Sequence, residues 1–207
     1  MKLYRPVGLE ELRRTYEENM RSYPQPLKAQ RSLDLSLSSA DAATIARNRN
    51  AGTEPYAGYV TELEIDDEYA AMHPHHPAKD GTERLLRIPI EDFEEFNTHL
   101  LGRIKVAAGF FGQQFRGYIP TMFNFAHRDA LSQFVMLSYL LDYSTMDFVG
   151  EIHANNLAVF LHLPYWSTCN LDRTEVPESR RPRILTAIQQ TWSKELPELP
   201  PLTPGEI

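Results

Sequence analysis

The sequence predicts an α+β fold, with helices packed around a sheet and a C-terminal αβ extension on the same core. Apolar and polar residues alternate in short runs such as 32–37 and 59–65, a period of two that is typical of strands burying one face. Between these runs, apolar residues recur at intervals of three and four, as in amphipathic helices. The 207 residues fit a single domain with additions, with a weak boundary near residue 108.

Strands and helices alternate through the first half of the chain. The first helix carries its apolar stripe from Leu9 to Met20, Pro24 and Pro26 end it, and Ser38 or Ser39 caps the second helix. We expect residues 66–81 to be irregular. The predicted strands are 3–7, 32–37, 59–65, 83–90 and 103–109, and the predicted helices are 9–20, 40–50 and 91–101.

The second half of the chain is more apolar. Residues 110–120 form an aromatic and glycine-rich connection before a helix at 129–141. Two apolar runs, 148–152 and 157–163, predict a β-hairpin around Ala154-Asn155-Asn156. A last helix is expected at 178–194, so residues 107–207 form the αβ extension.

Composition limits the classes of partner. The net charge of −7 argues against field-driven binding to a nucleic-acid backbone. The single cysteine excludes an intrachain disulfide and is compatible with a reducing compartment. Neither a signal pattern nor a run of membrane-spanning length is present, so we expect a cytoplasmic protein with no membrane contact.

Histidines offer two candidate sites. His73, His75 and His76 crowd a short proline-framed tract that could hold a transition metal, but the second ligand group of a zinc site is absent. We therefore expect a solvated loop and no metal. His153 and His162 are expected to face each other across the predicted hairpin as a structural polar contact.

Two further features have an ordinary explanation beside a functional one. Cys169 could act as a nucleophile beside a histidine, but no local signature supports that role, so a spectator thiol is expected. The basic cluster at 180–183 could contact nucleic acid or an acidic partner, although a solvated face is the simpler interpretation.

Arg5 is the most informative single residue. It is the only charged side chain in the strand 3–7 and precedes Gly8, where the chain turns into a helix. A guanidinium in that position is suited to an anion such as a phosphate. The alternative is an edge-strand arginine paired with a nearby carboxylate.

The order of segments resembles the ADP-ribosyltransferase superfamily in its arginine–serine–glutamate branch. The resemblance covers residues 3–106 and rests on "LYRPVGLEELRR", "LDLSLSSADAATIARN", "GYVTELEID" and "ERLLRIPIEDF". Most of the chain also resembles small bacterial proteins labelled ADP-ribosylation or crystallin J1-like, including "GFFGQQFRGYIP" and "MDFVGEIHANNLAVFL". The resemblance implies a split, mostly antiparallel sheet with a transferase-like core at 1–106.

The resemblance also implies roles in NAD cleavage, with NAD as substrate and a protein or nucleic acid as acceptor. Arg5, beside Tyr4, would contact the phosphate or the nicotinamide ribose, and Ser36 and Ser38 would brace the pocket. Glu83 would hydrogen-bond the ribose 2′-hydroxyl and stabilise the oxocarbenium ion through which the glycosidic bond breaks. Such an enzyme brings Arg5, Ser36 and Glu83 to one cleft.

The chain departs from the family pattern at two points. Pro6 stands where the family often has a small residue, and Asp80-Gly81-Thr82 lacks the usual acid or glutamine motif before Glu83. The alternative function is therefore a non-catalytic interaction module of the antitoxin, immunity or adaptor type. Its predicted contact patch consists of Phe110, Phe111, Phe115 and Tyr118.

Overall fold

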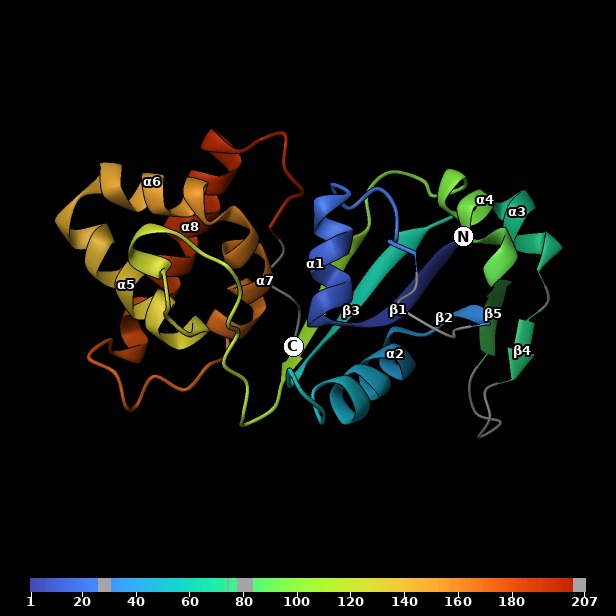
Figure 1. The fold of residues 1–207 in the computed structure, drawn as a ribbon, viewed down its shortest axis with the longest axis horizontal. Coiled ribbons are helices and arrows are strands. Elements are labelled where there is room, and N and C mark those ends of the chain that lie inside the picture. The colour runs from blue at the N-terminus through green and yellow to red at the C-terminus, as the bar shows by residue number, and fades with distance from the viewer. Residues whose placement is uncertain (26–30, 74, 78–83, 203–207) are drawn as a thin grey trace. The chain divides into compact units, whose positions relative to one another are not determined.

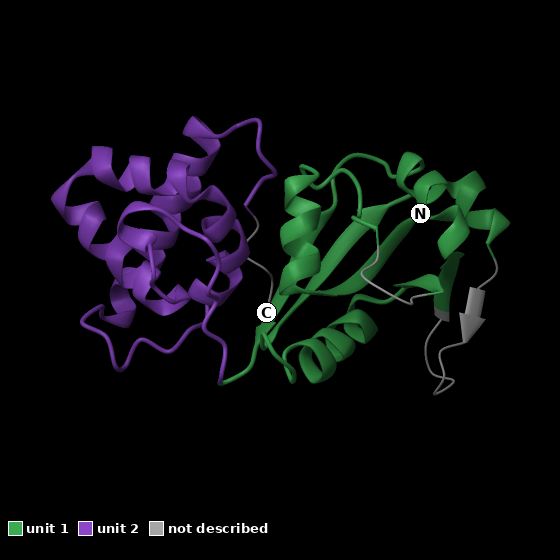
Figure 2. Ribbon diagram, viewed as in Figure 1, with its two compact units in different colours: residues 1–113, 205–207 green, residues 114–204 purple. Residues whose placement is uncertain are grey.

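The computed structural model describes residues 1–25, 31–73, 75–77 and 84–202. The chain forms two compact units, Met1–Gln113 and Gln114–Pro204 (Figure 2). The division lies close to the weak boundary predicted near residue 108. Each unit is described by itself below.

Unit 1 confirms the α+β class. Its six strands form one sheet in the order β4-β5-β2-β1-β3-β6, and every neighbouring pair is antiparallel (Figure 1). The strands are β1 (Lys2–Gly8), β2 (Ser32–Ser36), β3 (Ala57–Glu64), β4 (His75–Pro77), β5 (Arg84–Pro89) and β6 (Lys105–Phe111).

The helices of unit 1 lie between these strands as the sequence predicts, with one addition. Asp66 accepts hydrogen bonds from the backbone N–H groups of Glu68 and Tyr69 and so begins a short helix inside the stretch expected to be irregular. The helical segments are α1 (Leu9–Glu17), α2 (Ser39–Ile45), η1 (Ala46–Asn50, a π-helical turn), α3 (Asp67–Met72), η2 (Ile90–Asp92) and α4 (Phe93–Thr98).

The central strand β1 presents its side chains alternately to two helical layers. Tyr4 packs with the cluster of Ala42, Ala46 and Val60, which belongs to α2, η1 and β3. Arg5, the next residue, points to the other face, where its guanidinium meets α1. Helices α1 and α2 accordingly lie on opposite sides of the sheet in Figure 1.

The sheet opens between β1 and β2. These strands share a single aligned pair, Tyr4 with Ser36, whereas β1 pairs with β3 along its whole length. On one side of that pair, β1 runs on from Arg5 to Gly8, while the antiparallel residues of β2 before Ser36 pair with β5 and not with β1. The six strands nevertheless belong to one continuous sheet.

Glycine allows η1 to approach β3 closely. A Cβ added at Gly58 would lie 2.1 Å from the carbonyl oxygen of Ala46, far inside van der Waals contact. The backbone of η1 therefore rests directly on β3, and this contact sets the position of the residues that η1 carries.

Among its described residues, unit 2 contains helices and connecting segments but no strand, so the predicted αβ composition of the C-terminal extension is wrong for this unit. No helix in the described part of either unit is long and apolar enough to cross a membrane. The segments are η3 (Phe123–Phe125), α5 (Ala130–Tyr143), α6 (Thr145–Ala154), α7 (Asn156–Trp166), η4 (Glu178–Arg180) and α8 (Arg181–Glu195).

The predicted hairpin at 148–152 and 157–163 is also wrong, because both arms are helices. Every residue of α7 from Ala158 to Pro164 is buried, so its sequence shows no polar face and no period. Asn155, expected in a turn, is buried instead, and its side-chain amide bonds the backbone of Met122. An apolar run that follows two asparagines is compatible with either the second strand of a hairpin or a buried helix.

The close packing at Gly58 yields a prediction for stability. A Gly58→Ala substitution is expected to lower the free energy of unfolding of unit 1 by about 1–3 kcal/mol, because the methyl group collides with the Ala46 carbonyl. Chemical denaturation followed by circular dichroism measures the change. Gly150→Ala is the control: the site in α6 has open space, so this change should be neutral or stabilising by about 0.5–1 kcal/mol. Equal stability of the two variants would contradict the packing argument.

Candidate functional site

A pocket of about 450 Å³ lies where β1 and β2 separate. This volume is within the range of about 300–1,000 Å³ that is usual for small-molecule sites. Two residues predicted from the sequence, Arg5 and Ser36, line it from neighbouring strands. The lining residues are Arg5, Pro6, Gly8, Glu11, Arg31, Ser32, Asp34, Ser36, Ile45, Arg49, Asn50 and Leu85.

Arg5 is only 6% exposed, although its side chain is charged. Its Nε and Nη2 donate hydrogen bonds to Oε1 of Glu11 on α1, at 3.0 and 2.5 Å. The carboxylate partner of the simpler interpretation is confirmed, although β1 is a central strand and not an edge strand. The guanidinium also lines the pocket. Its Nη1 makes no hydrogen bond to any described residue, so part of its donor capacity is unused.

A buried network formed by Tyr23 and Thr61 holds Arg5 in position. The Arg5 guanidinium carbon lies 5.3 Å from the centroid of the Tyr23 ring, a cation–π contact. The Tyr23 hydroxyl lies 2.6 Å from Thr61 Oγ1, which donates to the Arg5 carbonyl oxygen at 3.0 Å. Burial raises the pKa of Tyr23, so its hydroxyl keeps its proton and donates to Thr61.

The two predicted serines have different positions. Ser36 is buried, and its hydroxyl donates to the Ser38 carbonyl and accepts from the Ser38 N–H, at 2.9 and 3.1 Å. The Ser38 hydroxyl accepts from the Asp41 N–H and caps α2. The pocket lining includes Ser36 but neither Ser38 nor Tyr4. Tyr4 contributes instead to the core under α2.

Glu83, the predicted catalytic carboxylate, lies outside the described residues. The strand that follows it is described, and Leu85 of β5 lines the pocket and pairs with Ser36. Three strands that carry or follow predicted site residues therefore border the same pocket.

Sequence reasoning missed three charged residues of the lining. Glu11 belongs to the polar side of α1, and its pairing with Arg5 follows from the turn at Gly8. Arg31 precedes β2. Arg49 lies in the π-helical turn η1, and no sequence pattern predicts a turn of this type. Within the described part of the chain, neither Arg31 nor Arg49 forms an ion pair.

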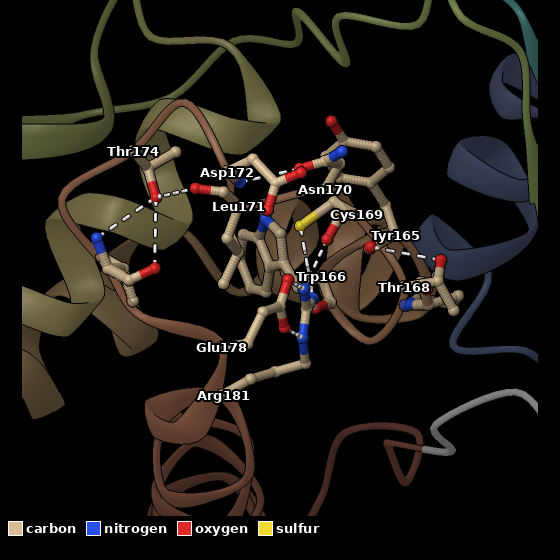
Figure 3. A network of polar contacts seen from close by, with 12 residues as sticks. Tyr165, Trp166, Thr168, Cys169, Asn170, Leu171, Asp172, Thr174, Glu178 and Arg181 are labelled. Carbon is tan, nitrogen blue, oxygen red and sulfur yellow. Dashed lines mark hydrogen bonds and ion pairs between the residues drawn. The ribbon is translucent and has the colours of Figure 1, made fainter.

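Cys169 lies in a polar network at the end of α7 in unit 2 (Figure 3). Arg181 donates to the carbonyls of Trp166 and Cys169, and it binds Glu178 at 2.7 Å. Burial raises the pKa of the Cys169 thiol, so the sulfur stays protonated near neutral pH. The arrangement favours the spectator thiol, with Arg181 satisfying the last carbonyls of α7.

The predicted contact between His153 and His162 is wrong, because the two residues belong to different helices rather than to facing strands. His153 is exposed. His162 is buried, and its Nδ1 lies 2.9 Å from Oε1 of Gln133 on α5. Burial lowers the pKa of His162 to about 3, so the imidazole is neutral in the folded protein.

The remaining predicted features are the histidine tract that begins at His73 and the basic cluster at 180–183. The ring of His73 contacts Tyr69 at 4.7 Å, and the side chains of His75 and His76 lie outside the described part. Among the described residues, no group of three potential metal ligands gathers. In the basic cluster, Arg180 and Arg183 both pair with Asp142 of α5, so a single carboxylate compensates half of their combined charge.

The predicted aromatic patch does not form as expected. Phe115 is buried in unit 2, where its ring contacts His162 and Tyr165. Phe110 and Phe111 belong to β6 of unit 1, where Phe110 lies under the guanidinium of Arg47.

No family model matches the chain, and no curated protein or solved structure matches it. The pocket is therefore interpreted from the residues that line it.

Burial of His162 predicts a pH dependence. The unfolded histidine has a pKa near 6.5 and the folded one near 3, so the unfolded state binds the extra proton as the pH falls below 6.5. The stability from His162 is fully present above pH 6.5 and is lost toward pH 3, by about 2 kcal/mol at pH 5. Urea unfolding at pH 7 and pH 5 measures this loss.

Two variants isolate the contribution of this imidazole. His162→Gln is expected to be less stable at pH 7 but to lose much less stability between pH 7 and pH 5. The control His153→Gln, at an exposed site, should keep the wild-type pH dependence. A wild-type pH dependence in His162→Gln would exclude His162 as its source.

Proposed function

We propose that unit 1 binds NAD in the pocket between β1 and β2 and transfers its ADP-ribosyl group to a protein or nucleic-acid acceptor. One observation carries the proposal: Arg5 and Ser36 line the same pocket, and β5, which begins just after Glu83, forms one of its walls. An NAD-dependent transferase of the arginine–serine–glutamate type needs these three strands around one site.

The side chains that line the pocket offer the charged and hydrogen-bonding groups that a dinucleotide requires. Guanidinium groups such as those of Arg5, Arg31 and Arg49 bind phosphate oxygens with directed hydrogen bonds. The side chains of Ser36 and Asn50 offer a hydroxyl and an amide to ribose hydroxyl groups. The buried network under Arg5 keeps the guanidinium in place before a ligand arrives, which lowers the entropy lost on binding.

In the proposed reaction, the bond between nicotinamide and ribose C1′ breaks, and neutral nicotinamide leaves with the electron pair. The positive charge that develops on the ribose is stabilised by the carboxylate of Glu83. A nucleophile of the acceptor then forms a bond to C1′ and loses its proton. Arg5 holds the phosphate side of the substrate, so the ribose is placed for this step.

A second candidate function is favoured by a separate observation in unit 2. Large apolar side chains are exposed there, with Tyr143 at 85% and Met146 at 80%. Exposed apolar side chains offer contacts to a partner protein when they gather on one face, as a non-catalytic antitoxin, immunity or adaptor module would require. The exposed set in unit 2 is Tyr118, Met122, Phe123, Tyr139, Tyr143 and Met146.

Nicotinamide release tests the enzymatic proposal. Purified protein incubated with NAD and cell extract is expected to release nicotinamide, and Glu83→Gln should reduce the rate by about a hundredfold or more, because the developing charge loses its carboxylate. Glu91→Gln, at an exposed glutamate outside the pocket lining, is the matched control and should keep the wild-type rate.

A negative result has a defined meaning. If the wild-type protein releases no nicotinamide and NAD does not shift its thermal unfolding, the enzymatic proposal is wrong. The interaction module is then tested by pull-downs with wild-type protein and with Tyr143→Ser, which removes the most exposed aromatic ring of unit 2.

A further inference from the structure

Among the charged side chains that line the pocket, the two carboxylates have ion-pair partners in the described part of the chain but two of the arginines do not. Two carboxylates line it, and each already has a partner: Glu11 binds Arg5, and Asp34 binds Arg87 of the neighbouring strand at 2.7 Å. Arg31 and Arg49 complete the charged lining, and neither pairs with a carboxylate in the described part of the chain. The pocket therefore presents two uncompensated guanidinium groups although the protein as a whole is acidic.

Arg5 adds a third, fixed donor. Glu11 occupies its Nε and Nη2, and Nη1 is left without a partner among the described residues. A guanidinium that is more than nine-tenths buried and still has unused N–H donors is well suited to an acceptor atom supplied by a ligand. Because Glu11 and the Tyr23 ring hold the group on two sides, this donor has a defined direction.

Arg31 and Arg49 come from different walls of the pocket and have anchored backbones. The Arg31 carbonyl accepts a hydrogen bond from Ile90 N–H at 3.1 Å, which ties the start of β2 to the end of β5. The Arg49 carbonyl accepts from Thr53 Oγ1 at 2.9 Å, and η1 rests on β3 through Gly58. Both side chains are exposed, so they can close on a ligand from two sides.

We propose that the pocket recognises a pyrophosphate group, with Arg31 and Arg49 each binding one phosphate and Nη1 of Arg5 donating to the same ligand. Cations on separate walls match two linked phosphates better than one, and a pocket of about 450 Å³ leaves room for the groups attached to them. This inference rests on the proposed function, because it assigns the pyrophosphate of the dinucleotide to particular residues.

Isothermal titration of the full chain tests the assignment. AMP, ADP, ADP-ribose and inorganic pyrophosphate serve as probes, and ligands with two phosphates are expected to bind about tenfold more tightly than AMP. Arg31→Gln and Arg49→Gln should each weaken ADP-ribose binding by about tenfold, and the double variant should weaken it further. Added salt should weaken binding in the wild-type protein more than in the variants.

Arg47→Gln is the matched control. Arg47 lies two residues before Arg49 on the same π-helical turn and is also exposed, but its guanidinium packs over Phe110 and does not line the pocket. The inference is wrong if AMP binds as tightly as ADP, or if Arg31→Gln and Arg49→Gln bind ADP-ribose as tightly as Arg47→Gln does.

The two proposals fail in different ways. Nicotinamide release by wild-type protein, together with unchanged ADP-ribose affinity in Arg31→Gln and Arg49→Gln, overturns the pyrophosphate assignment alone. Pyrophosphate binding that needs Arg31 and Arg49, without nicotinamide release, supports the assignment and overturns the enzymatic function.

Discussion

The separation of β1 from β2 is the constraint on which the site depends. The two antiparallel strands are aligned at only one pair of residues, Tyr4 and Ser36, so β1 after Tyr4 and β2 before Ser36 do not pair with each other. Had they remained paired, Arg5 and the strand residues after it would face a closed ladder of backbone hydrogen bonds. The opening turns the middle of the sheet into a cavity whose walls are a strand end, two helices and β5.

A cavity inside a sheet creates an electrostatic problem that Glu11 solves. Burying a guanidinium without a partner costs several kcal/mol, because the ion loses its hydration. Glu11 supplies a partner from the first turn of α1, where the helix dipole also favours a carboxylate. The ion pair uses one edge of Arg5 and leaves another edge available, so the group is stable without a ligand and still able to bind one.

The sequence predicted the parts of this arrangement that follow from local periodicity. Strands with a period of two, such as β2 and β3, were predicted correctly, but Arg5 lies in the middle of β1 and not at its end as the sequence suggested. Arg49 was missed because a π-helical turn resting on Gly58 is set by packing and has no local signature. Helix α7 was taken for a strand because an apolar run buried on all sides has no period to distinguish the two structures.

The pocket residues all lie between Arg5 and Leu85, so the chemistry proposed for the site requires only unit 1. In unit 2, the buried side chains of Glu151 and Asn155 are joined by a hydrogen bond, and several aromatic and methionine side chains are exposed. Buried hydrogen bonds of this kind rigidify a helical unit, and the exposed apolar side chains are the contacts proposed for a partner. The pocket proposed for the nucleotide and the side chains proposed for a partner therefore belong to different units, so each proposal can be tested by substitutions that leave the other set of residues unchanged.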